Sequence, residues 1–152
     1  MRVDDLDLAE PALSAARLLV ARHPGIVFTS GRRSVADQAR AMASNVRLNR
    51  RWIAETYRQT AERDMLQAWV DAHPAATSAA AIAAGLRGVM ARWTDDQRAR
   101  LSRHFSGHAF DVQPLPPGPE ARAVKATIRA LPGLTKFLEQ EGGLVRWHAQ
   151  FA

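Results

Sequence analysis

Two side chains that could bind a metal ion lie close together within residues 102–112. His104 offers an imidazole nitrogen and Asp111 offers a carboxylate oxygen, and the two residues are seven positions apart. Gly107 lies between them and permits a tight turn there. Because the chain contains no cysteine, any metal site must be built from histidine and carboxylate.

Residues 108–112 are expected to be extended, and this conformation decides which side chains share a face. Side chains alternate along a strand, so Asp111 lies on the same face as Ala109, which leaves room beside a metal ion. His108 then points to the opposite face together with Phe110. We therefore do not expect His108 to be a ligand if Asp111 is one.

A last strand, expected at residues 144–151, supplies a third candidate ligand, His148. Alternation gives this strand one polar face with Leu144, Arg146, His148 and Gln150, and one apolar core face with Val145, Trp147, Ala149 and Phe151. Three ligands would leave one position of a zinc site open for water, and such an open His and Asp site favours zinc over magnesium or calcium. Taken singly, each histidine is more typical of an ordinary surface or hydrogen-bonded residue than of a metal ligand.

The surrounding pattern predicts a small α+β domain. Ser34 followed by Asp37 is typical of a helix start, and Gly142-Gly143 of a turn into the last strand. We expect helices at residues 9–22, 35–72, 78–90, 94–101, 120–130 and 135–141, and extended segments at 26–29, 102–113 and 144–151.

The composition of the chain sets limits on its partners and location. The net charge of +6 predicts attraction to polyanions such as an anionic cell wall, although a genome that favours arginine explains it equally well. Residues 1–10 are acidic and carry no secretory signal pattern, and no apolar run approaches the length of a membrane span. We expect a protein that is made in the cytoplasm without a signal peptide and has no membrane span.

The sequence also raises the question of whether the protein binds nucleic acid. Residues 47–58 combine arginines with Trp52 and Tyr57. These aromatic residues have the helical spacing of a core, and the chain has no recognised nucleic-acid motif. No specific nucleic-acid partner is therefore expected.

The segment around His104 resembles a known signature. Ser102-x-His104-x-x-Gly107-x-Ala109-x-Asp111 is similar to the Ser-x-His-x-x-Gly-x-Ala-x-Asp pattern of the D-Ala-D-Ala metallopeptidases. These include D-alanyl-D-alanine dipeptidases and carboxypeptidases, and phage endolysins that cut L-alanyl-D-glutamate bonds.

Two further segments resemble the same family in the same order. Phe28 to Ser34, followed by Gln38, is similar to its Thr-Ser-Gly-Tyr-Arg-Ser segment, and Trp147-His148 is similar to its final zinc-binding histidine. Residues 45–95 resemble nothing in the family. The resemblance implies a single α+β domain over residues 1–152, with a central, largely antiparallel sheet and a helical insertion at about 45–95.

The resemblance also implies roles for individual residues. His104, Asp111 and His148 would hold Zn²⁺, and Arg33 would contact the substrate and support charge that develops at the scissile carbonyl. Gln38 and Ser102 would bind substrate. The implied reaction is hydrolysis of a peptide bond in the peptidoglycan stem, by a protein that we expect to be a monomer.

One position departs from the family pattern. A glutamate or aspartate that moves the proton normally stands three residues before the last histidine, where this chain has Val145. General base catalysis contributes roughly a hundredfold to ten-thousandfold. Three interpretations remain open: Glu141 or Glu139 replaces the base, with Glu141 favoured; the chain binds zinc and wall peptide without cutting; or Val145 is an introduced substitution that traps a complex.

The sequence thus predicts a zinc-dependent peptidoglycan peptidase. A small basic chain without a signal suits a phage endolysin, which reaches the wall of a Gram-negative cell through a membrane lesion. A cytoplasmic dipeptidase is the other enzyme that would need no export. The noncatalytic alternative is a module that binds cell-wall peptides.

Overall fold

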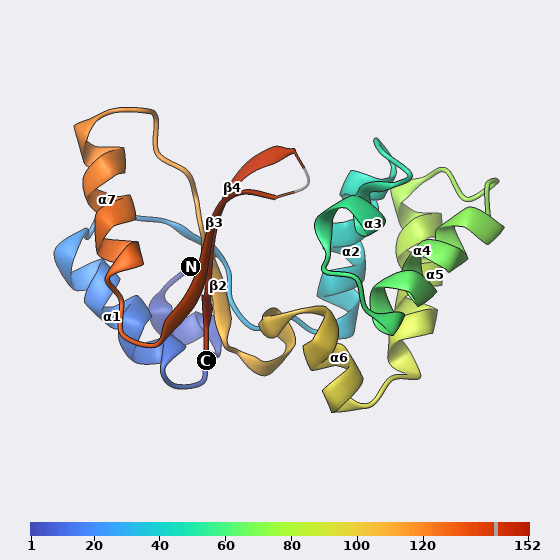
Figure 1. Ribbon diagram of the computed structural model, residues 1–152, viewed down its shortest axis with the longest axis horizontal. Helices are drawn as coiled ribbons and strands as arrows, with labels where there is room; N and C mark the ends of the chain where they lie inside the picture. The colour runs from blue at the N-terminus through green and yellow to red at the C-terminus, as the bar shows by residue number, and fades with distance from the viewer. Residues whose placement is uncertain (142) are drawn as a thin grey trace. The chain divides into compact units, whose positions relative to one another are not determined.

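The computed structural model describes residues 1–141 and 143–152, which form seven α-helices, two short 3-10 helices and a four-stranded antiparallel sheet (Figure 1). The prediction of an α+β fold with an antiparallel sheet is therefore confirmed. The turn predicted at Gly142-Gly143 falls in part on residue 142, outside the described residues. None of the helices in the described part of the chain is long and apolar enough to cross a membrane.

The chain divides into two compact units. The sheet unit consists of Met1–Arg32 and Ser106–Ala152, and the helical unit consists of Arg33–Phe105. The helical unit therefore begins earlier and ends later than the insertion predicted at about 45–95. That the whole chain acts as one domain with an insertion stays a prediction.

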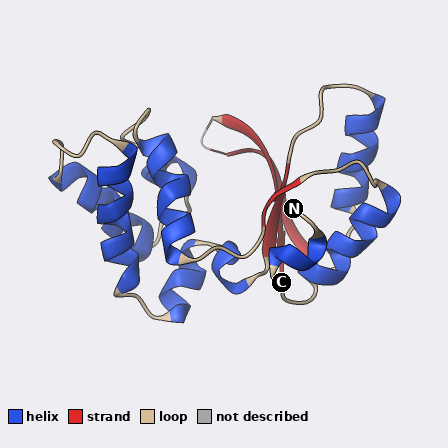
Figure 2. Ribbon diagram, turned by 180° about the vertical axis from the view of Figure 1, so that it is seen from behind, coloured by secondary structure: helices blue, strands red, loops and turns tan. Residues whose placement is uncertain are grey.

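The sheet unit is built on four strands in the order β1-β2-β4-β3, and every neighbouring pair is antiparallel. Figure 2 draws the strands in red. The strands are β1 (Phe28–Ser30), β2 (Ala109–Val112), β3 (Leu134–Glu141) and β4 (Leu144–Phe151). All four residues of β2 are buried, because this short strand lies between β1 and β4. The strands predicted near 26–29 and at 144–151 are confirmed.

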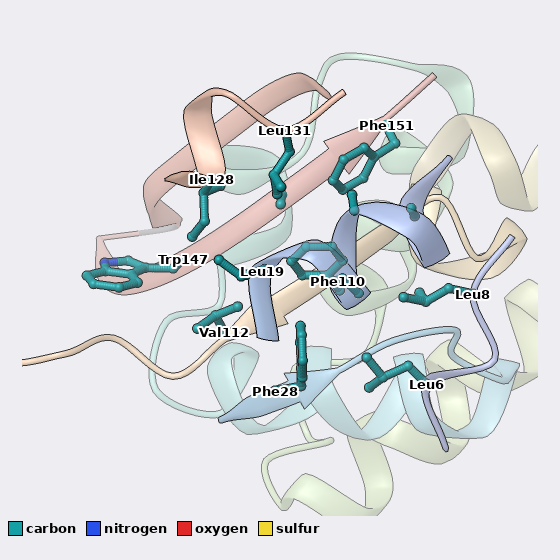
Figure 3. Close-up of a cluster of buried hydrophobic side chains, with 14 of the residues drawn as sticks. Leu6, Leu8, Leu19, Phe28, Phe110, Val112, Ile128, Leu131, Trp147 and Phe151 are labelled. Carbon is teal, nitrogen blue, oxygen red and sulfur yellow. The ribbon is translucent and has the colours of Figure 1, made fainter. Parts of the chain in front are cut away.

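Two helices, α1 (Ala12–Arg22) and α7 (Pro119–Arg129), pack against one face of this sheet. Figure 3 shows the resulting core, in which Phe110 of β2 lies among Phe28 and Phe151. The ring of Phe110 is 5.3 Å from each of these two rings, measured between centroids. A short 3-10 helix, η1 (Val3–Leu6), adds Leu6 to the same core. Asp111 and His148 lie on the opposite face of the sheet.

The helix predicted at 135–141 is wrong, because these residues belong to strand β3. The run Leu138 to Glu141 has a local preference for helix. Pairing with β4 along nearly its whole length overrides that preference, since the ladder satisfies the backbone hydrogen bonds and buries Phe137 against the core. Gly133, at φ 81°, turns the chain into the strand after α7.

The predicted core position of Val145 is also wrong. Its register partner in β3 is Gln140, whereas the partner of His148 is Leu138. Two steps along β3 thus correspond to three steps along β4, so β4 carries a bulge between Val145 and His148. The extra residue turns Val145 to the face of His148, and its side chain is 63% exposed.

The helical unit contains α2 (Val35–Val46), α3 (Trp52–Thr56), α4 (Ala61–Ala72), α5 (Ala79–Ala91) and α6 (Asp95–Leu101). Ser34 caps α2 as predicted, since its hydroxyl accepts a hydrogen bond from the backbone N–H of Asp37. The continuous helix predicted over 35–72 is in fact three helices. Thr60 is the N-cap of α4, the third of these helices. The helices at 78–90 and 94–101 are confirmed as α5 and α6.

We expect the Phe110→Ala variant to lose about 3–5 kcal/mol of unfolding free energy, because it leaves a cavity in the centre of the core. Urea denaturation followed by circular dichroism measures this loss. The matched control is Val145→Ala on the exposed position of the same unit, which we expect to change stability by less than about 0.5 kcal/mol. Equal effects of the two substitutions would contradict this account of the core.

Candidate metal centre

The three predicted ligands come together in the structure. One ligand atom from each of His104, Asp111 and His148 lies within 4.8 Å of the other two. All three residues are buried, with exposed fractions of 3%, 6% and 7% respectively. Buried ionisable side chains are uncommon unless they are paired or bind a metal ion. This group could hold a metal ion.

Sheet pairing places two of these ligands next to each other. Asp111 of β2 and His148 of β4 are direct register partners in the antiparallel ladder. Side chains of such partners leave the sheet on the same face with their Cβ atoms about 5 Å apart. Phe110 and Trp147 alternate with them and point into the core, so the two ligands share the face that α1 and α7 do not cover.

The third ligand, His104, lies in the single-turn helix η2 (Arg103–Ser106), which follows α6. The hydroxyl of Ser102 accepts a hydrogen bond from the backbone N–H of His104 at 3.2 Å. Gly107 then turns the chain toward β2 at φ 77°, a left-handed conformation that favours glycine. A Cβ atom at Gly107 would also lie 2.9 Å from the backbone nitrogen of Ala9, so the close packing there excludes a side chain.

Asp111 controls the protonation of His148. Burial of the imidazole opposes its charged form, but the hydrogen bond from His148 Nδ1 to Asp111 Oδ1 at 2.8 Å and the charge of Asp111 outweigh burial. The pKa of His148 is therefore raised, with smaller contributions from Glu141 and Gln150. A metal ion that binds Nδ1 would have to displace any proton held there, because only the neutral imidazole nitrogen is a ligand.

Gln150 orients the imidazole of His148 from its other side. The Nε2 atom of His148 is 3.4 Å from the amide oxygen of Gln150, which can only accept a hydrogen bond. A tautomer with its proton on Nε2 would donate to this oxygen and would leave Nδ1 to bind a metal ion. Gln150 has this place because it is two residues from His148 on the same face of β4.

The donor set fits a tetrahedral metal ion. Two imidazole nitrogens and one carboxylate oxygen at zinc distances of roughly 2.0–2.1 Å would be about 3.3 Å apart. The observed separations bracket this value, with 2.8 Å between Asp111 and His148, and at most 4.8 Å within the group.

The predicted substrate-binding residues occupy connected positions in the helical unit. The backbone N–H of Arg33 donates to the carbonyl oxygen of His104 at 3.0 Å. The guanidinium of Arg33 donates through Nη1 to the side-chain oxygen of Gln38, at 3.2 Å. The hydroxyl of Ser102 contacts the backbone of His104, so Ser102 supports a candidate ligand. Contact of these residues with substrate stays a prediction.

The two candidates for the missing base differ in their surroundings. Glu139 forms ion pairs with Lys125, at 2.6 Å, and with Arg129, both on α7. It therefore lies on the core side of the sheet and is held there. Glu141 acts on His148 instead, because its negative charge contributes to the raised pKa of that imidazole.

His108 does not join the metal-binding group, in agreement with the strand alternation. Its Nδ1 atom is 2.7 Å from the hydroxyl oxygen of Ser106. Two residues near the site had no assigned role from the sequence. Gln150 was placed on the correct face without a function, and Tyr57, which contacts Gln38, was treated as a core residue.

Comparison with known proteins gives no relative of this chain. No protein-family model, no curated protein and no solved structure matches it. The resemblance to the D-Ala-D-Ala metallopeptidases therefore rests on the motif residues alone.

We expect the protein to bind one zinc ion, and we expect alanine at His104, Asp111 or His148 to abolish stoichiometric binding. Removing one of three ligands leaves only two, which cannot complete the site. Isothermal titration calorimetry on chelator-treated protein measures the change. The control is His108→Ala, which should keep the wild-type stoichiometry; if it also loses the ion, the ligand assignment is wrong.

Proposed function

We propose that the protein is a zinc-dependent peptidase that hydrolyses a peptide bond in the stem of bacterial peptidoglycan. The observation that carries the proposal is the convergence of His104, Asp111 and His148 on one buried site. These are the three positions that the family signature assigns to zinc. The signature and the structure bring the same three residues together, although His148 is distant from the other two in the sequence.

Zinc is the metal that suits this donor set best. Two nitrogen donors and a single carboxylate disfavour magnesium and calcium, which prefer all-oxygen sites. A zinc ion held by these three residues would polarise the scissile carbonyl and activate water for attack on it. The chain itself must orient the peptide, support the developing negative charge and move the proton.

Arg33 is suited to support the negative charge on the carbonyl oxygen. A guanidinium stays charged at every relevant pH and donates several hydrogen bonds in a fixed plane. Its backbone is tied to the carbonyl of His104, and its side chain is tied to the buried amide of Gln38. A donor that is held in place before the reaction stabilises the transition state without a cost of reorganisation.

Glu141 is the carboxylate that we assign to proton transfer. It is the second carboxylate, after Asp111, whose charge raises the pKa of His148, and it is the last residue of β3. Glu139 is excluded from this role because Lys125 and Arg129 hold it on the other side of the sheet. A carboxylate near the site can take a proton from the attacking water and pass it to the leaving amine.

One observation favours a second function, a noncatalytic module that binds wall peptides. The bulge in β4 turns Val145 to the face of His148, and the side chain there is exposed. The position that carries the base in the family thus faces the site, but it bears an apolar group. A chain of this kind would bind zinc and a stem peptide without turnover.

The charge of the chain supports an endolysin setting over a cytoplasmic dipeptidase. The helical unit holds twelve arginines against seven aspartates and glutamates, so it accounts for most of the net charge of +6. A cationic unit would draw the protein to an anionic envelope. A dipeptidase that acts on small soluble peptides has no evident use for such a charge.

We expect the zinc-loaded protein to release stem-peptide fragments from purified peptidoglycan, and we expect their release to stop on chelation and to resume when zinc is restored. Mass spectrometry of the soluble products measures cleavage, and the fragment masses identify the bond. The zinc-binding variant His108→Ala serves as a positive control. A folded, zinc-loaded protein that releases no fragments would favour the binding module.

We expect Val145→Glu to raise kcat about tenfold or more, because it places a carboxylate on the face of His148 where general base catalysis typically contributes at least a hundredfold. Val145→Gln is the matched control, since it has nearly the same shape but cannot take up a proton. Glu141→Ala should lower the turnover of the wild-type chain by a similar factor. If Glu141→Ala has no effect on an active enzyme, the base is another group.

A further inference from the structure

A completely buried amide joins Arg33 to the aromatic residue that follows α3. The side chain of Gln38 is fully buried, and its oxygen accepts the hydrogen bond from Arg33 Nη1 at 3.2 Å. Its amide nitrogen donates to the hydroxyl oxygen of Tyr57 at 2.9 Å. Arg33, Gln38 and Tyr57 thus form a continuous chain of hydrogen bonds inside the helical unit.

The chemistry of the partners fixes the direction of this chain. A guanidinium has only donors, so the oxygen of Gln38 must face Arg33 and the NH₂ group must face Tyr57. A flipped amide would place two donors against each other. The guanidinium selects this orientation, and the Tyr57 hydroxyl, which accepts from the NH₂ group, adds a second hydrogen bond that holds Gln38 in it.

Tyr57 is itself firmly anchored. It follows directly after α3, and its ring meets the ring of Trp52 edge to face, with centroids 5.7 Å apart. Trp52 belongs to the core of the helical unit. An aromatic pair of this geometry restricts the movement of the phenol ring. The hydroxyl of Tyr57 is therefore held in a fixed position next to Gln38.

Arg33 is consequently held at both ends. Its backbone N–H is bonded to the carbonyl of the ligand His104, and its guanidinium is bonded to Gln38. Long arginine side chains lose considerable freedom when fixed, and a fold that fixes one in advance removes that cost from the reaction.

We propose that Tyr57 is a positioning residue, which acts through Gln38 to hold the guanidinium of Arg33 ready for the substrate. The inference rests on the function proposed for Arg33, and it gives a role to residues 45–95, which the family resemblance leaves without one. The helical segment then contributes to the reaction as well as to the fold.

The first test reads the position of Arg33 without any activity. Side-chain ¹⁵N NMR measures how fast the guanidinium of Arg33 rotates in the wild-type chain and in Tyr57→Phe, which keeps the ring against Trp52 and removes only the hydroxyl. We expect rotation to become several-fold faster in Tyr57→Phe. Unchanged rotation in a folded variant would overturn the proposal.

The matched control is Thr56→Val, which removes the neighbouring hydroxyl. Among the described residues the Thr56 hydroxyl has no hydrogen-bond partner, so its loss should leave the rotation of Arg33 and the turnover unchanged. An equal effect of Thr56→Val and Tyr57→Phe would mean that both act by loosening α3, and it would also overturn the proposal.

The second test is a double-mutant cycle on peptidoglycan cleavage. Tyr57→Phe should lower kcat about 3- to 10-fold, the usual effect of one hydrogen bond, with little change in KM. It should have no further effect when Arg33 is already alanine. An equal loss in both backgrounds would show that Tyr57 acts independently of Arg33. If the wild-type chain cleaves nothing, the proposed function fails, and the NMR measurement still decides whether Tyr57 positions Arg33.

Discussion

The antiparallel pairing of β2 with β4 is the constraint on which the rest of the site depends. Its register sets Asp111 directly opposite His148, so the hydrogen-bond ladder of the backbone fixes the distance between carboxylate and imidazole. The same register sets Phe110 opposite Ala149 on the other face. One residue of slip would send the ligands into the core and the aromatic ring toward solvent. Core packing and ligand geometry are therefore specified together.

This coupling explains why so short a strand can carry the site. β2 has four residues, all of them buried, and it is flanked by strands on both sides. The aromatic contacts of Phe110 with Phe28 and Phe151 resist any movement of the strand. The face that carries Asp111 and His148 is held by the same packing. Its polar groups therefore stay in place before a metal ion binds, as a binding site requires.

Much of the site could be predicted from the sequence because strand alternation is a local property. Alternation placed Asp111 and His148 on the faces that they occupy and set His108 aside, whereas His104, which lies in a 3-10 helix, was found from its residue type and its place in the motif. The face predicted for Val145 by alternation is wrong, because a bulge adds a residue to β4. No local sequence pattern indicates this bulge. The helix expected at 135–141 failed for a related reason, since pairing with β4 is a long-range interaction that local propensity does not contain.

The hydrogen bonds between side chains could not be predicted from the sequence. Gln38 and Tyr57 are nineteen positions apart, and nothing in their spacing indicates that a buried amide joins them. Gln150 lay on a face that alternation identified, but its contact with the ring of His148 depends on side-chain rotation. Sequence patterns reveal which faces meet, whereas the partners of individual polar atoms emerge only in three dimensions.

The bulge in β4 also has an evolutionary consequence. By turning position 145 out of the core, it frees that position from the packing constraints on Trp147 and Phe151. Codons for valine and glutamate can differ by a single nucleotide. A lineage that carries this bulge could therefore lose or regain a carboxylate at the site in one mutational step, with no intermediate that folds poorly.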